Sequence, residues 1–245
     1  MSNQNNFYCK VSTYEELKKA IEQEETKFYI TNRITANSDL KLSNRNYYFF
    51  IDGYLDMDKY SFDFCESELT LKIESISDET LRGIIWHPLG ESYLFINDKY
   101  ARSINLYNTS IFIYSPVPKV YIQETVNINA LNSSIYADSL TGKTETILNL
   151  KKDGGLLQNC FFDSIKIIIN SKKTSINNCT FDECLLFLEN AKYTKITDCH
   201  FYGSQLTIPF ITSNTIISNC TNDDSSKPII YNNSSMTTLK SNCFF

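Results

Sequence analysis

Glycine and proline are scarce in this chain, with 7 and 5 residues among 245. Their scarcity excludes collagen-like and low-complexity architectures. The sequence has no apolar run of the roughly 18 residues that a membrane-spanning helix needs. The N-terminus also lacks the basic and apolar segments of a secretory signal. We therefore expect a cytoplasmic protein with no contact to the membrane.

Clustered positive charge is also missing. The formal net charge is −5, and the nearest approach to a basic run is the pair Lys172 and Lys173. A surface that follows a nucleic-acid backbone needs clustered Lys and Arg. The sequence therefore predicts no direct binding to nucleic acid. Only four arginines are present: Arg33, Arg45, Arg82 and Arg102.

Cysteine, by contrast, is regularly placed. None of the 8 cysteines forms a Cys-x-x-Cys pair, so we predict no structural zinc site. In the last third of the chain the cysteines recur at intervals typical of solenoid repeats. Small apolar side chains at such intervals stack well inside a coil, and we expect reduced thiols there. These cysteines are Cys160, Cys179, Cys199, Cys220 and Cys243.

Each of these cysteines except the last belongs to a longer repeat. An aliphatic residue lies three positions before it and Asn or Asp immediately before it, as in Ile176, Asn178 and Cys179. Segments of alternating apolar residues follow, such as Ile165, Ile167 and Ile169, which is the pattern of a strand with one buried face. Three short strands per repeat, separated by Asn, Ser, Asp or Gly, predict a coil.

One helix is expected before the repeats, at about residues 13–24. Ser12 with Glu15, or Thr13 with Glu16, forms a capping box. Tyr14, Leu17 and Ile21 then follow at helical spacing. We expect this amphipathic helix, as the first ordered element, to cover one end of the coil.

The predicted fold is thus all-β: a single-stranded right-handed parallel β-helix of about ten coils, at roughly 4.8 Å per coil, with an N-terminal capping helix. Residues 1–37 form the cap with the first strand, and 38–245 form the β-helix, in one structural domain overall. A leucine-rich solenoid is the alternative, since its repeat also ends in Asn or Cys. Phe244 and Phe245 at the far end either pack back or mark a self-association surface.

The amphipathic helix, the strand around Phe28–Ile34 and the Asn-Cys units resemble the pectin-lyase-like family of right-handed parallel β-helices. The resemblance concerns the fold, which hosts many activities. It implies carbohydrate-active relatives, among which lyases use a calcium carboxylate cluster with a basic residue. Calcium would be a cofactor only in that case; otherwise we expect no cofactor and no metal.

Two carboxylates are weak candidates for catalysis. Asp163 and Asp182 each lie three residues after a cysteine and would face each other one coil apart, near the separation of a retaining glycosidase pair. The other interpretation is that they close turns. The sequence completes no catalytic set, so we expect no enzymatic activity. His200 is expected to be an exposed strand residue.

Aromatic residues of the irregular first half are the candidate binding residues, because sugar-binding grooves and protein interfaces both use exposed rings. Two functions remain open. The first is a non-enzymatic interaction protein, such as a phage- or bacterium-derived inhibitor that binds a host macromolecular complex. The second is a carbohydrate-binding or carbohydrate-cleaving β-helix, such as a polysaccharide lyase, a hydrolase or a tail-spike protein. The candidate residues are Trp86, His87, Tyr93, Tyr107, Tyr114 and Tyr121.

Overall fold

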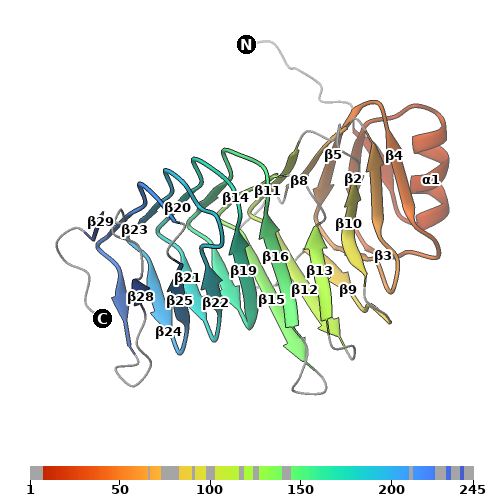
Figure 1. The fold of residues 1–245 in the computed structure, drawn as a ribbon. Coiled ribbons are helices and arrows are strands. Elements are labelled where there is room, and N and C mark those ends of the chain that lie inside the picture. Colours follow the sequence, from red (N-terminus) through yellow and green to blue (C-terminus); the bar gives the residue numbers. More distant parts are fainter. Residues whose placement is uncertain are drawn as a thin grey trace, which may run out of the picture.

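Three parallel sheets wrap around one axis to form a β-solenoid with a short helix at its N-terminal end (Figure 1). The structure is a computed structural model. It describes residues 8–65, 67–72, 83–89, 92–97, 103–115, 119–123, 127–139, 145–209, 212–223, 230–232 and 238–239.

From β2 onward the chain visits the three sheets in turn, so consecutive strands lie in different sheets. Sheet A contains β1 (Cys9–Val11), β2 (Lys27–Ile30), β5 (Asn46–Ile51), β8 (Glu68–Lys72), β11 (Ser103–Tyr107), β14 (Asn127–Leu131), β17 (Leu156–Gln158), β20 (Ser175–Asn177), β23 (Lys195–Thr197), β26 (Ile216–Ser218) and β29 (Thr238–Leu239). Sheet B contains β3 (Arg33–Thr35), β6 (Tyr54–Asp56), β9 (Gly83–Trp86), β12 (Ser110–Ser115), β15 (Ser134–Ser139), β18 (Phe161–Asp163), β21 (Thr180–Asp182), β24 (His200–Tyr202) and β27 (Thr221–Asn222). Sheet C contains β4 (Leu40–Ser43), β7 (Phe62–Cys65), β10 (Tyr93–Asn97), β13 (Lys119–Gln123), β16 (Glu145–Leu150), β19 (Ile165–Ile169), β22 (Leu185–Phe187), β25 (Gln205–Ile208) and β28 (Ile230–Asn232).

The solenoid makes about 8 turns rather than the ten predicted from a uniform repeat. Asn178 and Asn159, at the same corner of neighbouring coils, are 19 residues apart. Longer coils lie in the middle of the chain: Thr70 and Asn105 lie in register on β8 and β11 but are 35 residues apart. The leucine-rich alternative is wrong, because the described coils are built from three strands with no helix between them.

The helix α1 (Tyr14–Glu22) begins at Thr13, which accepts a hydrogen bond from the backbone N–H of Glu16 at 3.2 Å. The Glu16 carboxylate accepts one in return from the Ser12 N–H at 2.7 Å, so the second of the two capping registers is the one adopted. The first described element is a strand, however: β1 precedes the helix and pairs with β2, which the sequence analysis missed. No helix in the described part of the chain is long and apolar enough to span a bilayer.

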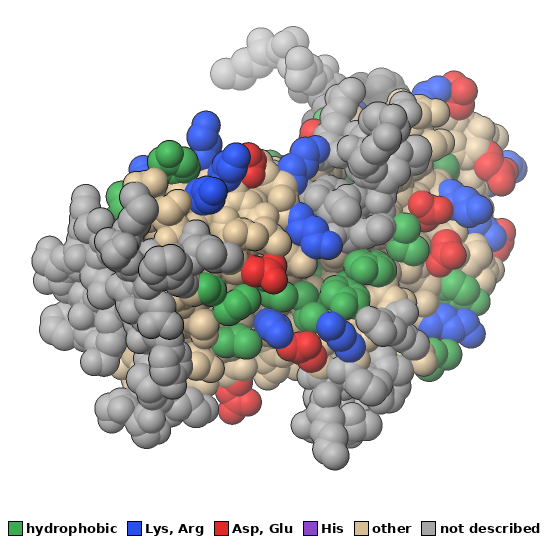
Figure 2. Space-filling model, in the orientation of Figure 1, with side chains coloured by type: hydrophobic (Ala, Val, Ile, Leu, Met, Phe, Trp, Pro, Cys, Tyr) green, Lys and Arg blue, Asp and Glu red, His purple; other side chains and the backbone are tan. Residues whose placement is uncertain are grey.

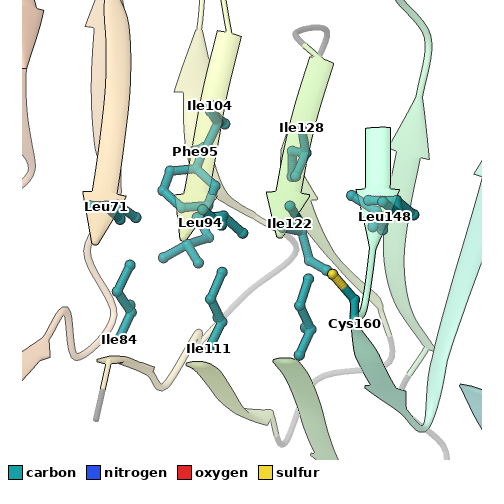
Figure 3. Close-up of a cluster of buried hydrophobic side chains, with 14 of the residues drawn as sticks. Leu71, Ile84, Leu94, Phe95, Ile104, Ile111, Ile122, Ile128, Leu148 and Cys160 are labelled. Atoms are coloured by element: carbon teal, nitrogen blue, oxygen red, sulfur yellow. The ribbon is translucent and has the colours of Figure 1, made fainter. Parts of the chain in front are cut away.

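The core is a continuous column of side chains that point inward from all three sheets (Figure 3). Leu71, Ile84 and Leu94 in one coil are followed by Ile104, Ile111 and Ile122 in the next, all fully or almost fully buried. In the later coils the rings of Phe162, Phe181 and Phe201 stack at centroid distances of 5.4 and 4.9 Å. Burying these columns supplies the hydrophobic free energy that holds the coils together.

Asparagines form a ladder at the corner between sheets A and B. The left-handed backbone needed for the sharp bend is one that Asn adopts at low cost, and Asn178 has φ 50°. The side-chain amides of Asn132, Asn159 and Asn178 each donate a hydrogen bond to the Asn at the same corner of the preceding coil. The donor–acceptor distances are 3.2 Å for Asn132–Asn108, 2.9 Å for Asn159–Asn132 and 2.9 Å for Asn178–Asn159.

The residue after this corner points into the core, and there the predicted inward cysteines are confirmed. Cys160, Cys179, Cys199 and Cys220 are buried, whereas Cys243 lies outside the described residues. Each buried thiol donates to the backbone carbonyl two residues earlier, as Cys199 does to Thr197 at 3.2 Å. In an earlier coil Ser133 occupies the same position and makes the same bond to Leu131 at 3.0 Å. A small side chain with a donor therefore suits this position.

Candidate functional site: an aromatic groove on sheet B

The structure distributes five of the six candidate binding residues over three faces and buries the sixth. Tyr107 lies on the outer side of sheet A, apart from the rest. Tyr93 and Tyr121 lie in register on sheet C, and His87 and Tyr114 lie on sheet B. Trp86 is 0% exposed and points into the core, so it contributes nothing to any surface. Its indole Nε1 has no hydrogen-bond partner among the described residues.

The outer face of sheet B carries two stacks of rings. His87 and Tyr114 stack at 5.1 Å with an interplanar angle of 17°. Beside them Phe112 and Tyr136 stack at 5.2 Å with their planes within 5°, and Phe161 continues the row at 5.5 Å from Tyr136. The pairing of Phe112 with Tyr136 follows from parallel register, which places corresponding residues of neighbouring strands side by side, whereas Phe161 lies two residues before Asp163, the register partner of Tyr136.

Carboxylates border these rings. Phe112, Tyr136, Asp163 and Asp182 follow one another in register along a single column on the outside of sheet B. Asp138 lies on β15 opposite Tyr114 and is exposed. Asp163 accepts a hydrogen bond from the Ser164 hydroxyl at 2.7 Å. The two carboxylates of this column thus lie between Tyr136 on one side and Tyr202, the register partner of Asp182, on the other.

A groove of about 430 Å³ lies between the rings and the carboxylates. Its volume is in the range of small-ligand sites. Aromatic faces and carboxylate oxygens together can hold a cationic side chain, or a sugar ring with its hydroxyl groups. The groove is lined by Phe112, Ile113, Tyr114, Tyr136, Ala137, Asp138, Asp163 and Ser164. We refer to it as the aromatic groove.

The predicted pairing of Asp163 and Asp182 is present as strand register, one coil apart. No ion pair found among the described residues brings a Lys or Arg to either carboxylate. Nor does the described part of the chain contain a group of three His, Cys, Asp or Glu side chains arranged to hold a metal ion.

The predicted exposure of His200 is confirmed, and its ring Nδ1 lies 2.6 Å from the Thr221 hydroxyl on the neighbouring strand. This contact leaves the imidazole on the outer face of sheet B, on the strand next to the one that carries Asp182. Cys199 points the other way, into the core, so the two do not form a catalytic pair.

A second apolar surface covers the outside of sheet C. Tyr93 and Tyr121 stack at 4.8 Å, and the Lys119 ammonium lies 5.2 Å from the Tyr121 ring. Half-buried aliphatic and aromatic side chains continue the surface on β19 and β22. Figure 2 shows hydrophobic side chains gathered over this face, with a short row of charged ones beside them. On this sheet Lys166 forms an ion pair with Glu145 at 2.6 Å.

Phe112, Tyr136 and Asp138 were not among the binding residues predicted from the sequence. The sequence pattern that indicates their outward position is the alternation of Ile111 and Ile113 with Phe112 and Tyr114, and of Ile135 with Tyr136. Alternation shows that these rings share an outward face of their strand. It does not show which strand lies alongside, and the groove exists only through that pairing.

The fold and the groove together define a parallel β-solenoid with an outward-facing aromatic and acidic groove. No match to this chain was found among protein-family models, curated proteins or solved structures.

Proposed function

We propose that this chain is a non-enzymatic interaction protein that recognises basic side chains of a partner protein in the aromatic groove. The observation that carries the proposal is the groove itself. Stacked rings lie on a rigid sheet, and carboxylates border them. Arginine and lysine side chains are attracted to both features, because the ring face is electron-rich and the carboxylate is a charged acceptor.

Three properties support recognition rather than catalysis. The groove is built on strands whose main-chain hydrogen bonds fix the rings in place, which lowers the entropy cost of binding. Asp138, Asp163 and Asp182 carry negative charge, and a basic partner would be steered toward them. The overall charge of −5 acts in the same direction. The partner would be a protein or a macromolecular complex with an exposed basic segment.

The test is titration calorimetry with a panel of Arg-rich, Lys-rich and acidic peptides of equal length. We expect the basic peptides to bind and the acidic ones not to. The double variant Asp138→Asn and Asp163→Asn should lose at least about tenfold in affinity, since a charged contact is worth roughly 1.5–3 kcal/mol. The matched control, Glu22→Gln with Glu25→Gln, removes the same charge from the helix end and should leave affinity unchanged.

Equal losses in the groove variant and the control would show that only net charge matters, and would contradict the proposal. If none of the basic peptides bound to the folded, unsubstituted protein, that result would also contradict the proposal. Tyr136→Ser supplies an uncharged test of the same groove, because it removes a ring and leaves every carboxylate.

Carbohydrate binding is the second candidate, and the row of Phe112, Tyr136 and Phe161 is the observation that favours it. Rings repeated along the axis suit successive sugar units, and the resemblance to pectin-lyase-like proteins points the same way. Neutral and acidic hexasaccharides tested in the same titrations separate the two functions. Cleavage assays with and without calcium, repeated on Asp163→Ala and Asp182→Ala variants, test the lyase or hydrolase form; activity lost in these variants would favour it.

A further inference from the structure

Lysines gather along the edge where sheet C turns into sheet A. They come from three consecutive coils and are all exposed, and Figure 2 shows Lys and Arg side chains along this upper edge. Their sequence separation conceals the cluster, because neighbouring coils are about twenty residues apart. We call this surface the lysine edge, and it comprises Lys151, Lys172, Lys173, Lys192 and Lys195.

The register of the coils fixes the spacing of the lysine edge. Lys172 and Lys192 face each other in a parallel bridge, so their backbones are separated by one strand spacing of about 4.8 Å. The ion pairs found among the described residues include none of the five lysines. Two acidic residues lie nearby: Asp153 accepts from the Lys172 N–H at 2.8 Å, and Glu189 accepts from the Asn170 amide at 2.7 Å. Positive charge therefore predominates.

A small pocket opens between the two bridged lysines. Its volume is about 190 Å³, and it is lined by Asn170, Ser171, Lys172, Asn190, Lys192 and Asp153. The Asn170 amide donates to Glu189 and the Ser171 hydroxyl is hydrogen-bonded to Thr174, so the two lysines are the groups that can contact a phosphate at this pocket.

An exposed tyrosine lies in the last coil of the lysine edge. Tyr193 is 56% exposed and adopts a left-handed backbone with φ 55° at the corner, between Lys192 and Lys195. The equivalent corner positions are Lys173 one coil earlier and Asn214 one coil later. The exposed ring of Tyr193 is therefore accessible for a base to stack on it.

We propose that the lysine edge binds single-stranded nucleic acid. Proteins that bind single strands combine a basic track for the backbone with aromatic side chains on which bases stack. The lysine edge provides both, with Tyr193 as the stacking ring and the lysines as phosphate contacts. The sequence alone predicts no binding to nucleic acid, because it contains no basic run. The lysine edge forms only where successive coils bring separate lysines together. The proposal therefore departs from the prediction made from the sequence.

The lysine edge is independent of the aromatic groove. It lies where sheet C turns into sheet A, whereas the groove lies on sheet B, and the two surfaces carry opposite charges. Loss of peptide binding in groove variants would therefore leave this proposal standing, and the reverse also holds.

The test uses fluorescence anisotropy of the whole chain with labelled dT12 and rU12 oligonucleotides at several salt concentrations. Affinity should fall with salt with a logarithmic slope of about −0.7 for each phosphate contacted. Lys172→Gln with Lys192→Gln should weaken binding and make the slope shallower by about 0.7, because the two lysines share one phosphate contact. The matched control is Lys10→Gln with Lys27→Gln, an equal change of charge near the N-terminal end of sheet A, and it should change neither.

Tyr193→Asn separates stacking from charge. Asn already occupies the next corner in the column, so the variant should fold, as thermal unfolding would verify. We expect it to weaken oligonucleotide binding by roughly tenfold, within the range for one base stacked on an aromatic ring, while leaving the salt slope unchanged.

Three results would overturn the proposal. One is no binding of either oligonucleotide at low salt by the folded protein. The second is equal binding of polyglutamate of matched charge, or equal binding by Tyr193→Asn, either of which would show a purely ionic surface. The third is an equal effect of the two lysine double variants.

Discussion

The side-chain amide of Asn178 donates a hydrogen bond to Oδ1 of Asn159 at 2.9 Å, joining the same corner of two successive coils. Both residues adopt a left-handed backbone, with φ 50° and 53°. A single residue type thus satisfies the bend and links one coil to the next.

Asn178→Ala should lower the free energy of unfolding by about 1–3 kcal/mol, because alanine adopts the left-handed conformation at a cost and forms no ladder bond. Asn178→Gly removes the bond but keeps the backbone freedom, so its loss should be smaller. Urea unfolding followed by circular dichroism measures both. Equal losses for the two variants would show that the backbone conformation contributes nothing at this corner.

Cys199→Ser should cost less than about 1 kcal/mol, since serine at the corresponding corners makes the same bond to the carbonyl two residues earlier. Cys199→Leu should cost about 1–3 kcal/mol, because the column of stacked small side chains has no room for extra methylenes. The same urea experiment compares them. A destabilising serine and a tolerated leucine would reverse the expected order and contradict the packing account.

Alkaline pH should destabilise the fold through Cys184. Burial raises the pKa of this thiol to about 12, from an ordinary value of 9.0. The thiol therefore ionises first in the unfolded chain, so its contribution to stability is complete below pH 9 and declines as the pH rises toward 12. Tyr14 acts in the same direction, because burial raises its pKa to about 12 from 10.0.

Unfolding titrations from pH 8 to 11 on the native chain and on Cys184→Ser measure this effect. Serine is the residue at the equivalent corner of the next coil, where Ser204 donates to Tyr202 at 2.9 Å. We expect a shallower decline for the variant. An unchanged decline would show that the Cys184 thiol does not contribute.

Phe181→Ala should be the most damaging of these substitutions, with a loss of about 3–5 kcal/mol from the cavity left between Phe162 and Phe201. Because each coil contacts only its neighbours, the loss should weaken the later coils most. Hydrogen exchange should then rise in residues 195–223 more than in residues 40–65, and Phe181→Leu should show a smaller version. Uniform loss of protection along the chain would contradict this neighbour-only coupling.

Local rules explain why the fold could be predicted in outline. The recurring Asn before an inward Cys indicates a bend followed by a strand, and the alternation of Ile165, Ile167 and Ile169 indicates one buried face. The number of turns was overestimated because the middle of the chain contains longer coils, as between Thr70 and Asn105. The strand β1 was missed because its three residues carry no distinguishing pattern.

The sequence by itself determined the inside of this protein, because stacking needs only the spacing of small and apolar residues along the chain. It did not decide which exposed residues meet. Tyr114 stacks on His87, Asp163 follows Tyr136 and Lys172 faces Lys192 only because coil lengths set the register between strands. Coil length depends on insertions that no local pattern measures, so the aromatic groove and the lysine edge were decided by the tertiary structure alone.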